Sequence, residues 1–212
     1  MNLKLVIFDM DGVLVDACDW HKDAFNEALE EICGYTISNE DHYNIFNGLP
    51  TKVKLKKLTE MGIVSSEQHE LINNLKQEKT INIIKQKAQR DMSKIELITW
   101  LKEENVEVAC FTNSIRETAT LMLEKAGVYE MLDCFITNQD VKNSKPHPEG
   151  YLKVLKLFNC SAEDAIIVED SPKGIKAAEA SGCKVMKVKN ATYVNTNNIK
   201  EFINESFNPN GR

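Results

Sequence analysis

The sequence has no apolar stretch that approaches the roughly 20 residues a membrane-spanning helix needs. Its opening apolar run, residues 3–8, ends at Asp9 and is too short for a secretion signal. The six cysteines occur singly, without the C-x-x-C spacing of zinc or redox sites, and several lie inside apolar runs. We therefore expect a soluble, cytoplasmic protein with reduced, buried thiols and no membrane partner.

Positive charge is also scarce. The 212 residues include 26 Lys and Arg against 32 Asp and Glu, which gives a formal net charge of −6 and a pI near 5.4. Without a positive field to attract phosphate backbones, nucleic acid is not an expected partner. The 42% hydrophobic and 27% charged residues are ordinary for a soluble globular chain, and the length allows one domain with a modest insertion.

Short apolar strands alternate with amphipathic helices along most of the chain. We expect five strands, at residues 3–8, 106–111, 135–137, 165–168 and 184–188. This alternation predicts an α/β fold, a doubly wound parallel sheet with helices on both faces. Residues 17–90 show helical patterns only, which predicts an α/β core domain of residues 1–16 and 91–212 and an inserted α-helical cap domain of residues 17–90. The mostly polar segment 204–212 predicts a loosely held tail.

Polar side chains follow four of the predicted strands. Ligands of a doubly wound sheet bind beyond the carboxyl ends of its strands, so we expect these side chains on one rim. They are Asp9 and Asp11 after the first strand, Thr112, Asn113 and Ser114 after the second, Lys145 in the loop after the third, and Glu169 and Asp170 at the end of the fourth.

These residue types point to phosphoryl transfer. Clustered carboxylates repel one another unless a cation lies among them, and Mg²⁺ is the natural oxygen-liganded candidate. We expect it between Asp9, Asp11 and Asp170, with Lys145 as a second positive charge. The Thr112 hydroxyl and the neighbouring backbone N–H groups, at the start of a predicted helix, are placed to hold a phosphate.

Four segments, in order, resemble the motifs of the haloacid dehalogenase (HAD) superfamily: Asp9-Met10-Asp11-Gly12-Val13, Phe111-Thr112-Asn113-Ser114, Ser144-Lys145-Pro146-His147-Pro148-Glu149 and Val168-Glu169-Asp170-Ser171-Pro172-Lys173-Gly174. The resemblance spans essentially the whole chain. It implies a Rossmann-like core, and the helical insert resembles the small cap of the subgroup that contains β-phosphoglucomutase and phosphoglycolate phosphatase.

The resemblance also implies roles for individual residues. Asp9 is implied to be the nucleophile that becomes an aspartyl phosphate, and Asp11 the general acid and then the base. Mg²⁺ is implied to be held by Asp9, the Asp11 backbone carbonyl and Asp170, with Glu169 either a ligand or a partner of a metal-bound water. Phosphoryl binding is implied for Thr112 and Lys145, beside Asn113 and Ser114.

The insert resembles the family less closely. His21 is similar to a substrate-facing histidine that phosphatases and mutases of the subgroup both have. The loop Gly48-Leu49-Pro50-Thr51-Lys52 resembles the specificity loop of the cap. There, Thr51 stands where β-phosphoglucomutases carry an arginine for a second phosphate, with Lys52 as an alternative cation one residue later. The surrounding lysine run, with Lys54, Lys56 and Lys57, is expected to be a solvated face.

We therefore predict a Mg²⁺-dependent phosphatase, a phosphoric monoester hydrolase whose partner is a small phosphorylated metabolite such as a sugar phosphate. In the first alternative, a β-phosphoglucomutase-like mutase, a sugar hydroxyl replaces water as the group that attacks the aspartyl phosphate. A non-catalytic phospho-receiver module and a 2-haloacid dehalogenase are less favoured, because Asp11 is suited to hydrolysing a phosphoenzyme. We expect a monomer or a weak homo-oligomer.

Overall fold

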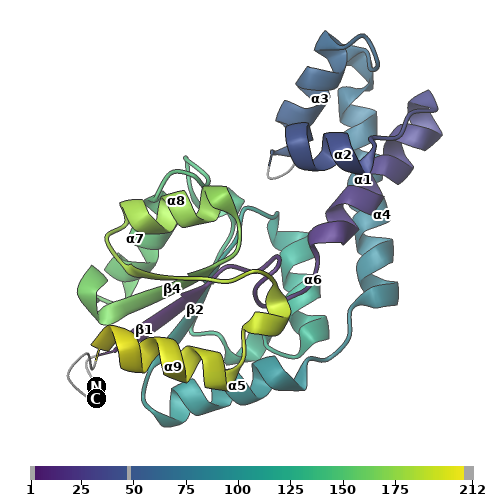
Figure 1. Ribbon diagram of the computed structural model, residues 1–212. Helices are drawn as coiled ribbons and strands as arrows, with labels where there is room; N and C mark the ends of the chain where they lie inside the picture. Colours follow the sequence, from purple (N-terminus) through teal and green to yellow (C-terminus); the bar gives the residue numbers. More distant parts are fainter. Residues whose placement is uncertain (1–2, 47–48, 208–212) are drawn as a thin grey trace. The chain divides into compact units, whose positions relative to one another are not determined.

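The computed structural model of the chain describes residues 3–46 and 49–207 (Figure 1). The chain divides into two compact units. The first, the core unit, comprises Met1–Asp16 and Gln89–Arg212. The second, the insert unit, comprises Ala17–Ala88.

A parallel β-sheet forms the centre of the core unit. Every β1 residue is buried, as expected of a central strand covered on both faces. Among the described residues the sheet has five strands in the order β3-β2-β1-β4-β5, with bounds Cys134–Ile136 (β3), Glu107–Phe111 (β2), Leu5–Phe8 (β1), Ala165–Glu169 (β4) and Lys184–Lys187 (β5). The chain winds from β1 toward β3 and then from β4 toward β5, so the direction reverses between β1 and β4. Ligand sites of such sheets lie at this reversal.

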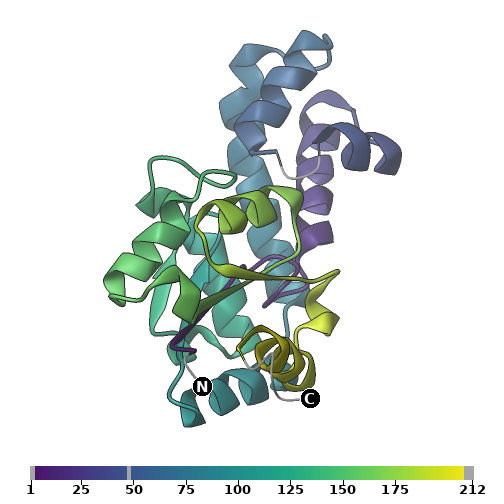
Figure 2. The same cartoon turned by 60° about the vertical axis from the view of Figure 1, so that its left-hand side comes forward.

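Helices cover both faces of the sheet, which confirms the predicted doubly wound α/β fold. Figure 1 and Figure 2 show α7 and α8 on one face and α5 and α9 on the other. The helices are α5 (Met92–Glu103), α6 (Arg116–Ala126), α7 (Glu149–Leu157), α8 (Pro172–Ala180) and α9 (Thr196–Phe207), with single 3-10 turns η3 (Tyr129–Met131), η4 (Asn138–Asp140), η5 (Ala162–Asp164) and η6 (Ala191–Tyr193).

The helix α9 overturns the prediction of a loose tail for residues 204–207. The helix continues to Phe207, and its apolar stripe, Ile199 and Ile203, is buried. A polar composition did not prevent helix formation because two isoleucines, four residues apart, place one apolar edge against the protein. Residues 208–212 lie outside the described residues.

The insert unit is helical throughout its described residues. Its elements are α1 (Cys18–Cys33), α2 (Asn39–Asp41), the π-helical turn η1 (His42–Phe46), α3 (Thr51–Glu60), η2 (Ser66–Gln68) and α4 (His69–Lys87). Its own apolar core, which includes Phe25, Phe46, Leu58 and Ile72, lies between these helices. The unit therefore has the buried surface needed to pack as a separate body.

One close approach in the core unit gives a stability prediction. Gly150 lies in the first turn of α7 under the ring of Phe111, and a Cβ at this position would lie 2.2 Å from the ring. We expect Gly150→Ala to lower the free energy of unfolding by about 1–3 kcal/mol, because overpacking outweighs the better helix propensity of alanine. Urea unfolding followed by circular dichroism measures the change.

The matched control is Lys156→Ala, an exposed change on the same helix. It should alter the free energy of unfolding by no more than about 0.5 kcal/mol. Equal stabilities for Gly150→Ala and the unsubstituted protein would show that α7 has room to move away from Phe111.

Candidate active site

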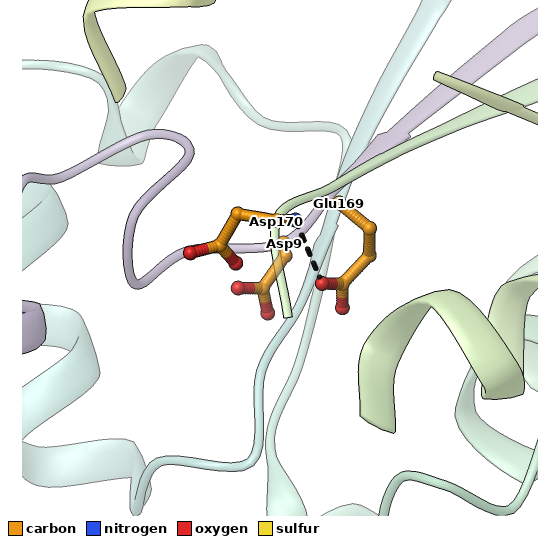
Figure 3. Close-up of side chains that lie close together, drawn as sticks. All are labelled: Asp9, Glu169 and Asp170. Atoms are coloured by element: carbon orange, nitrogen blue, oxygen red, sulfur yellow. Dashed lines mark hydrogen bonds between the residues drawn. The ribbon is translucent and has the colours of Figure 1, made fainter. Parts of the chain in front are cut away.

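Three carboxylates meet at the carboxyl edge of the sheet, where its winding reverses. Asp9 follows β1, and its backbone N–H donates to the Val168 carbonyl of β4 at 3.0 Å, so the two central strands stay paired up to this residue. Glu169 ends β4 and Asp170 follows it. One carboxylate oxygen from each acidic residue lies within 4.8 Å of the others (Figure 3).

Lys145 brings a positive charge into this group from the loop before α7. Its ammonium nitrogen donates to Oδ1 of Asp9 and, at 2.6 Å, to Oε1 of Glu169. All three side chains are buried. Because a buried ion pair loses its hydration, each of these charges depends on the others for compensation.

The pKa values of Asp9, Lys145 and Asp170 are all raised, for different reasons. Burial and the charge of Glu169 hold the pKa of Asp9 well above its ordinary value, and Lys145 only partly offsets them. Burial by itself lowers the pKa of Lys145, but Asp9 and its other anionic neighbours outweigh that effect and raise it well above its ordinary value. Lys145 is therefore cationic at neutral pH. Burial and the charge of Glu169 also raise the pKa of Asp170 to about 6.

Glu169 is fully engaged by hydrogen bonds. Its Oε1 accepts from Lys145 and, at 2.8 Å, from the Tyr151 hydroxyl. Its Oε2 accepts from the N–H of Asp170 and from the N–H and hydroxyl of Ser171. At Gly174, in the first turn of α8, a Cβ would lie 1.7 Å from Oε1, so only glycine leaves room for this carboxylate. The carboxyl group of Glu169 is thus held in one orientation.

Asp11 is close enough to these carboxylates that its charge adds to burial and to the charge of Glu169 in raising the pKa of Asp9 and of Asp170. The Oδ2 of Asp11 accepts from the Ser114 hydroxyl at 2.9 Å and from the Thr112 hydroxyl at 3.4 Å. Asp11 lies at the start of a tight turn. Gly12, at φ 85°, lets the chain fold back, and its N–H donates to the Val15 carbonyl. The hydroxyls of Thr112 and Ser114, which follow β2, hold the side chain of Asp11.

Of the residues after β2, Thr112 and Ser114 hold Asp11, and Asn113 holds the loop of Lys145. Thr112 is buried, and its hydroxyl also accepts from the Ser114 N–H at 3.0 Å. The Asn113 amide pairs with the backbone of Lys145: its nitrogen donates to the Lys145 carbonyl and its oxygen accepts from the Lys145 N–H. Helix α6 begins later, with Ile115 as its N-cap and no side-chain cap bond. Asn113 therefore anchors the loop that carries Lys145.

The remaining predicted residues belong to the insert unit. His21 lies on α1, and its Nδ1 is 3.3 Å from the ammonium nitrogen of Lys76 on α4. Thr51 begins α3, and Lys52 after it is exposed. Gly48 of the predicted specificity loop lies outside the described residues.

The lysine run of α3 departs from the solvated face that we expected. Lys54 is 9% exposed, and its ammonium nitrogen lies 5.6 Å from the centre of the Phe25 ring. The sequence alone does not show which lysine of the run is buried. The helical twist turns one of the four lysines toward the apolar side, where the aliphatic part of its side chain packs.

Sequence reasoning missed Tyr151, which reaches Glu169 from α7. The available signal was its position on the apolar stripe with Val154 and Leu155. A tyrosine buried among aliphatic residues needs a partner for its hydroxyl, and an acidic residue at the end of a neighbouring strand is such a partner.

Comparisons with known proteins agree with this geometry. A sequence model of the haloacid dehalogenase-like hydrolase family matches residues 6–188. The chain belongs to this family. The resemblance carried by the four motifs is confirmed, and so is the prediction that the chain is a HAD-type hydrolase.

Relatives of this HAD chain include named phosphatases. The phosphorylated carbohydrates phosphatase of Thermotoga maritima is 27% identical over 180 residues, which cover 85% of this chain and 82% of the relative. The validoxylamine A 7'-phosphate phosphatase of Streptomyces hygroscopicus subsp. limoneus is 27% identical over 187 residues, which cover 84% and 82%. The solved β-phosphoglucomutase of Clostridium difficile has a TM-score of 0.79 at 22% identity over 98% of both chains, a likeness of fold.

Within residues 3–46 and 49–207, no helix combines the length and apolar character required to cross a bilayer.

The donor set of this HAD chain fits Mg²⁺. Carboxylate oxygens are the ligands that Mg²⁺ prefers, and three carboxylates converge here. In Figure 3 the carboxylates of Asp170 and Glu169 lie on opposite sides of that of Asp9. Because Glu169 is already saturated with donors, Asp9 and Asp170 are the side chains that would hold the ion.

Mg²⁺ should stabilise the folded protein through Asp170. At about pH 7.5, ten times the dissociation constant of Mg²⁺ should raise the free energy of unfolding by about 1.4 kcal/mol. At about pH 5 the increase should be smaller, because Asp170, with its pKa raised to about 6, is then mostly protonated and protons compete with the metal. Thermal unfolding with and without Mg²⁺ measures both values.

Asp170→Asn should lose this stabilisation, whereas Asp16→Asn, a matched change at an exposed aspartate, should keep it. An identical response to Mg²⁺ in the Asp170→Asn protein would refute the assignment of this ligand.

Proposed function

We propose that the chain is a Mg²⁺-dependent phosphatase that hydrolyses a small phosphomonoester, such as a sugar phosphate, through an aspartyl phosphate on Asp9. The observation that carries the proposal is the buried contact of Asp9 with Lys145, beside Asp170, at the sheet's winding reversal. Two relatives that are named as phosphatases of small phosphorylated molecules support this substrate class.

In the first step, an Asp9 carboxylate oxygen attacks the phosphorus atom, and the bond between phosphorus and the ester oxygen breaks. Asp11 gives its proton to the departing oxygen, so the product leaves as an alcohol. Lys145 and the backbone N–H of Asn113 are suited to bind the phosphoryl oxygens, while the hydroxyl hydrogens of Thr112 and Ser114 stay on Asp11. When bound, Mg²⁺ supplies positive charge that reduces the repulsion between the carboxylate and the phosphoryl group.

In the second step, water attacks the aspartyl phosphate. Asp11, now ionised, accepts a proton from this water, and the bond between phosphorus and Asp9 breaks to release inorganic phosphate. The hydrogen bonds that Asp11 accepts from Ser114 and Thr112 support this role, because they orient one acid for both proton transfers.

The insert unit, in this proposal, is the cap that excludes bulk water and selects the substrate. His21, Thr51 and Lys52 are its proposed substrate-facing residues. The alternative hypothesis is a β-phosphoglucomutase-like mutase. It is disfavoured because Thr51 stands where such mutases carry an arginine. With a hexose 1-phosphate and Mg²⁺, a phosphatase releases inorganic phosphate, whereas a mutase forms the isomeric hexose phosphate.

The proposal predicts that Mg²⁺ supports repeated turnover of p-nitrophenyl phosphate and that Asp9→Asn lowers kcat by at least about 10³-fold, because the variant lacks the nucleophile. Release of p-nitrophenolate measures both. Asp16→Asn is the control and should keep the activity of the parent protein. Stoichiometric labelling without turnover would favour the phospho-receiver reading, and an active Asp9→Asn variant would refute the nucleophile.

The role of Asp11 gives a separate kinetic prediction. p-Nitrophenolate leaves readily without a proton, so Asp11→Asn should slow mainly the hydrolysis of the aspartyl phosphate, by about 10²–10⁴-fold. Rapid-mixing measurements should then show a burst of about one p-nitrophenolate per protein molecule, followed by slow turnover. Turnover at the parent rate with no burst would contradict this assignment.

A further inference from the structure

We propose that Tyr151 is a positioning residue that holds the ammonium group of Lys145 against Asp9 by way of Glu169. The inference rests on the proposed function, in which Lys145 neutralises the nucleophile and the phosphoryl group. Tyr151 donates to Glu169, which also binds Lys145, so we place its effect on the reaction through these two neighbours.

The hydroxyl of Tyr151 and the ammonium group of Lys145 share one acceptor. Tyr151 is 0% exposed and donates to Oε1 of Glu169 at 2.8 Å, and Lys145 donates to the same oxygen at 2.6 Å. Two donors on one carboxylate oxygen must approach it along different directions. The phenol therefore restricts the direction from which Lys145 can approach Glu169.

The aromatic rings enclose the ammonium group as well. The Lys145 nitrogen lies 4.9 Å from the centre of the Phe111 ring and 5.1 Å from that of Tyr151. The two rings meet edge to face, 5.0 Å apart at 89°. Both faces attract a cation, so Lys145 has little freedom to move away from Asp9.

Glu169 can transmit this restraint because its other oxygen is also held. The N–H groups of Asp170 and Ser171 and the Ser171 hydroxyl bind Oε2. Gly174 lets α8 lie directly against the carboxylate, and Gly150 lets α7 lie directly against Phe111. Tyr151 thus connects two close-packed helices to the lysine of the site.

Tyr151→Phe tests the inference, because phenylalanine keeps the ring and its packing and removes only the hydroxyl. With p-nitrophenyl phosphate and Mg²⁺ we expect kcat to fall about 10-fold to 100-fold, as for the loss of a hydrogen bond to a charged group. KM should change less than about threefold, because Tyr151 is 0% exposed and offers a substrate no surface to bind. Tyr129→Phe, which removes a hydroxyl elsewhere in the core unit, is the matched control and should leave both constants unchanged.

A double-mutant cycle separates positioning from general packing. In a Glu169→Gln background, Tyr151→Phe should cost less than about threefold in kcat, because the path through Glu169 is already broken. The inference would be overturned if Tyr151→Phe lowered kcat as much in the Glu169→Gln background as in the parent protein. It would also be overturned if Tyr151→Phe alone left kcat unchanged.

A second measurement does not depend on activity. Nuclear magnetic resonance of ¹⁵N-lysine-labelled protein should show a slowly exchanging Lys145 ammonium signal, identified by its loss in Lys145→Arg, since this side chain is 3% exposed. Tyr151→Phe should speed its hydrogen exchange about tenfold, and Tyr129→Phe should not. If the parent protein has no phosphatase activity but the signal still responds, the proposed function fails and the positioning role stands. An unchanged exchange rate overturns the positioning role whatever the activity.

Discussion

The buried ammonium group of Lys145, held between Asp9 and Glu169, is the interaction on which the rest of the site depends. Without it, two carboxylates would lie close together in a region from which water is largely excluded. Such an arrangement favours protonation, and a protonated Asp9 would be a poor nucleophile in the mechanism that we propose. With the lysine in place, one negative charge is balanced within the protein, and Asp9 and Asp170 can share a divalent ion.

The fold provides this arrangement through close packing on one face of the sheet. Asp9 and Lys145 are 136 residues apart, and the parallel order of β3, β2 and β1 brings the segments that follow β1 and β3 to a common edge. Gly150 and Gly174 lie where α7 and α8 approach Phe111 and Glu169 most closely. The helices therefore contribute to the chemistry by fixing the groups that hold the lysine.

Much of this could be predicted from the sequence. The strands were recognisable because short apolar runs alternate with helical periodicity, and the acidic residues after them were recognisable because strand ends form the ligand edge of such sheets. The prediction failed where side-chain direction decides the outcome. Lys54 packs beside Phe25, and residues 204–207 continue a helix.

The order of elements, the family and the acidic, basic and hydroxyl side chains expected on one rim could be inferred from the amino-acid sequence, because they depend on local periodicity and on motifs that are each short and continuous. How those side chains pair became clear from the three-dimensional packing. No sequence motif identifies the partner of Tyr151, and the saturation of Glu169 depends on donors from α7, from the two residues before α8 and from the loop of Lys145. Hydrogen bonds between distant segments follow from packing in three dimensions, which no local pattern encodes.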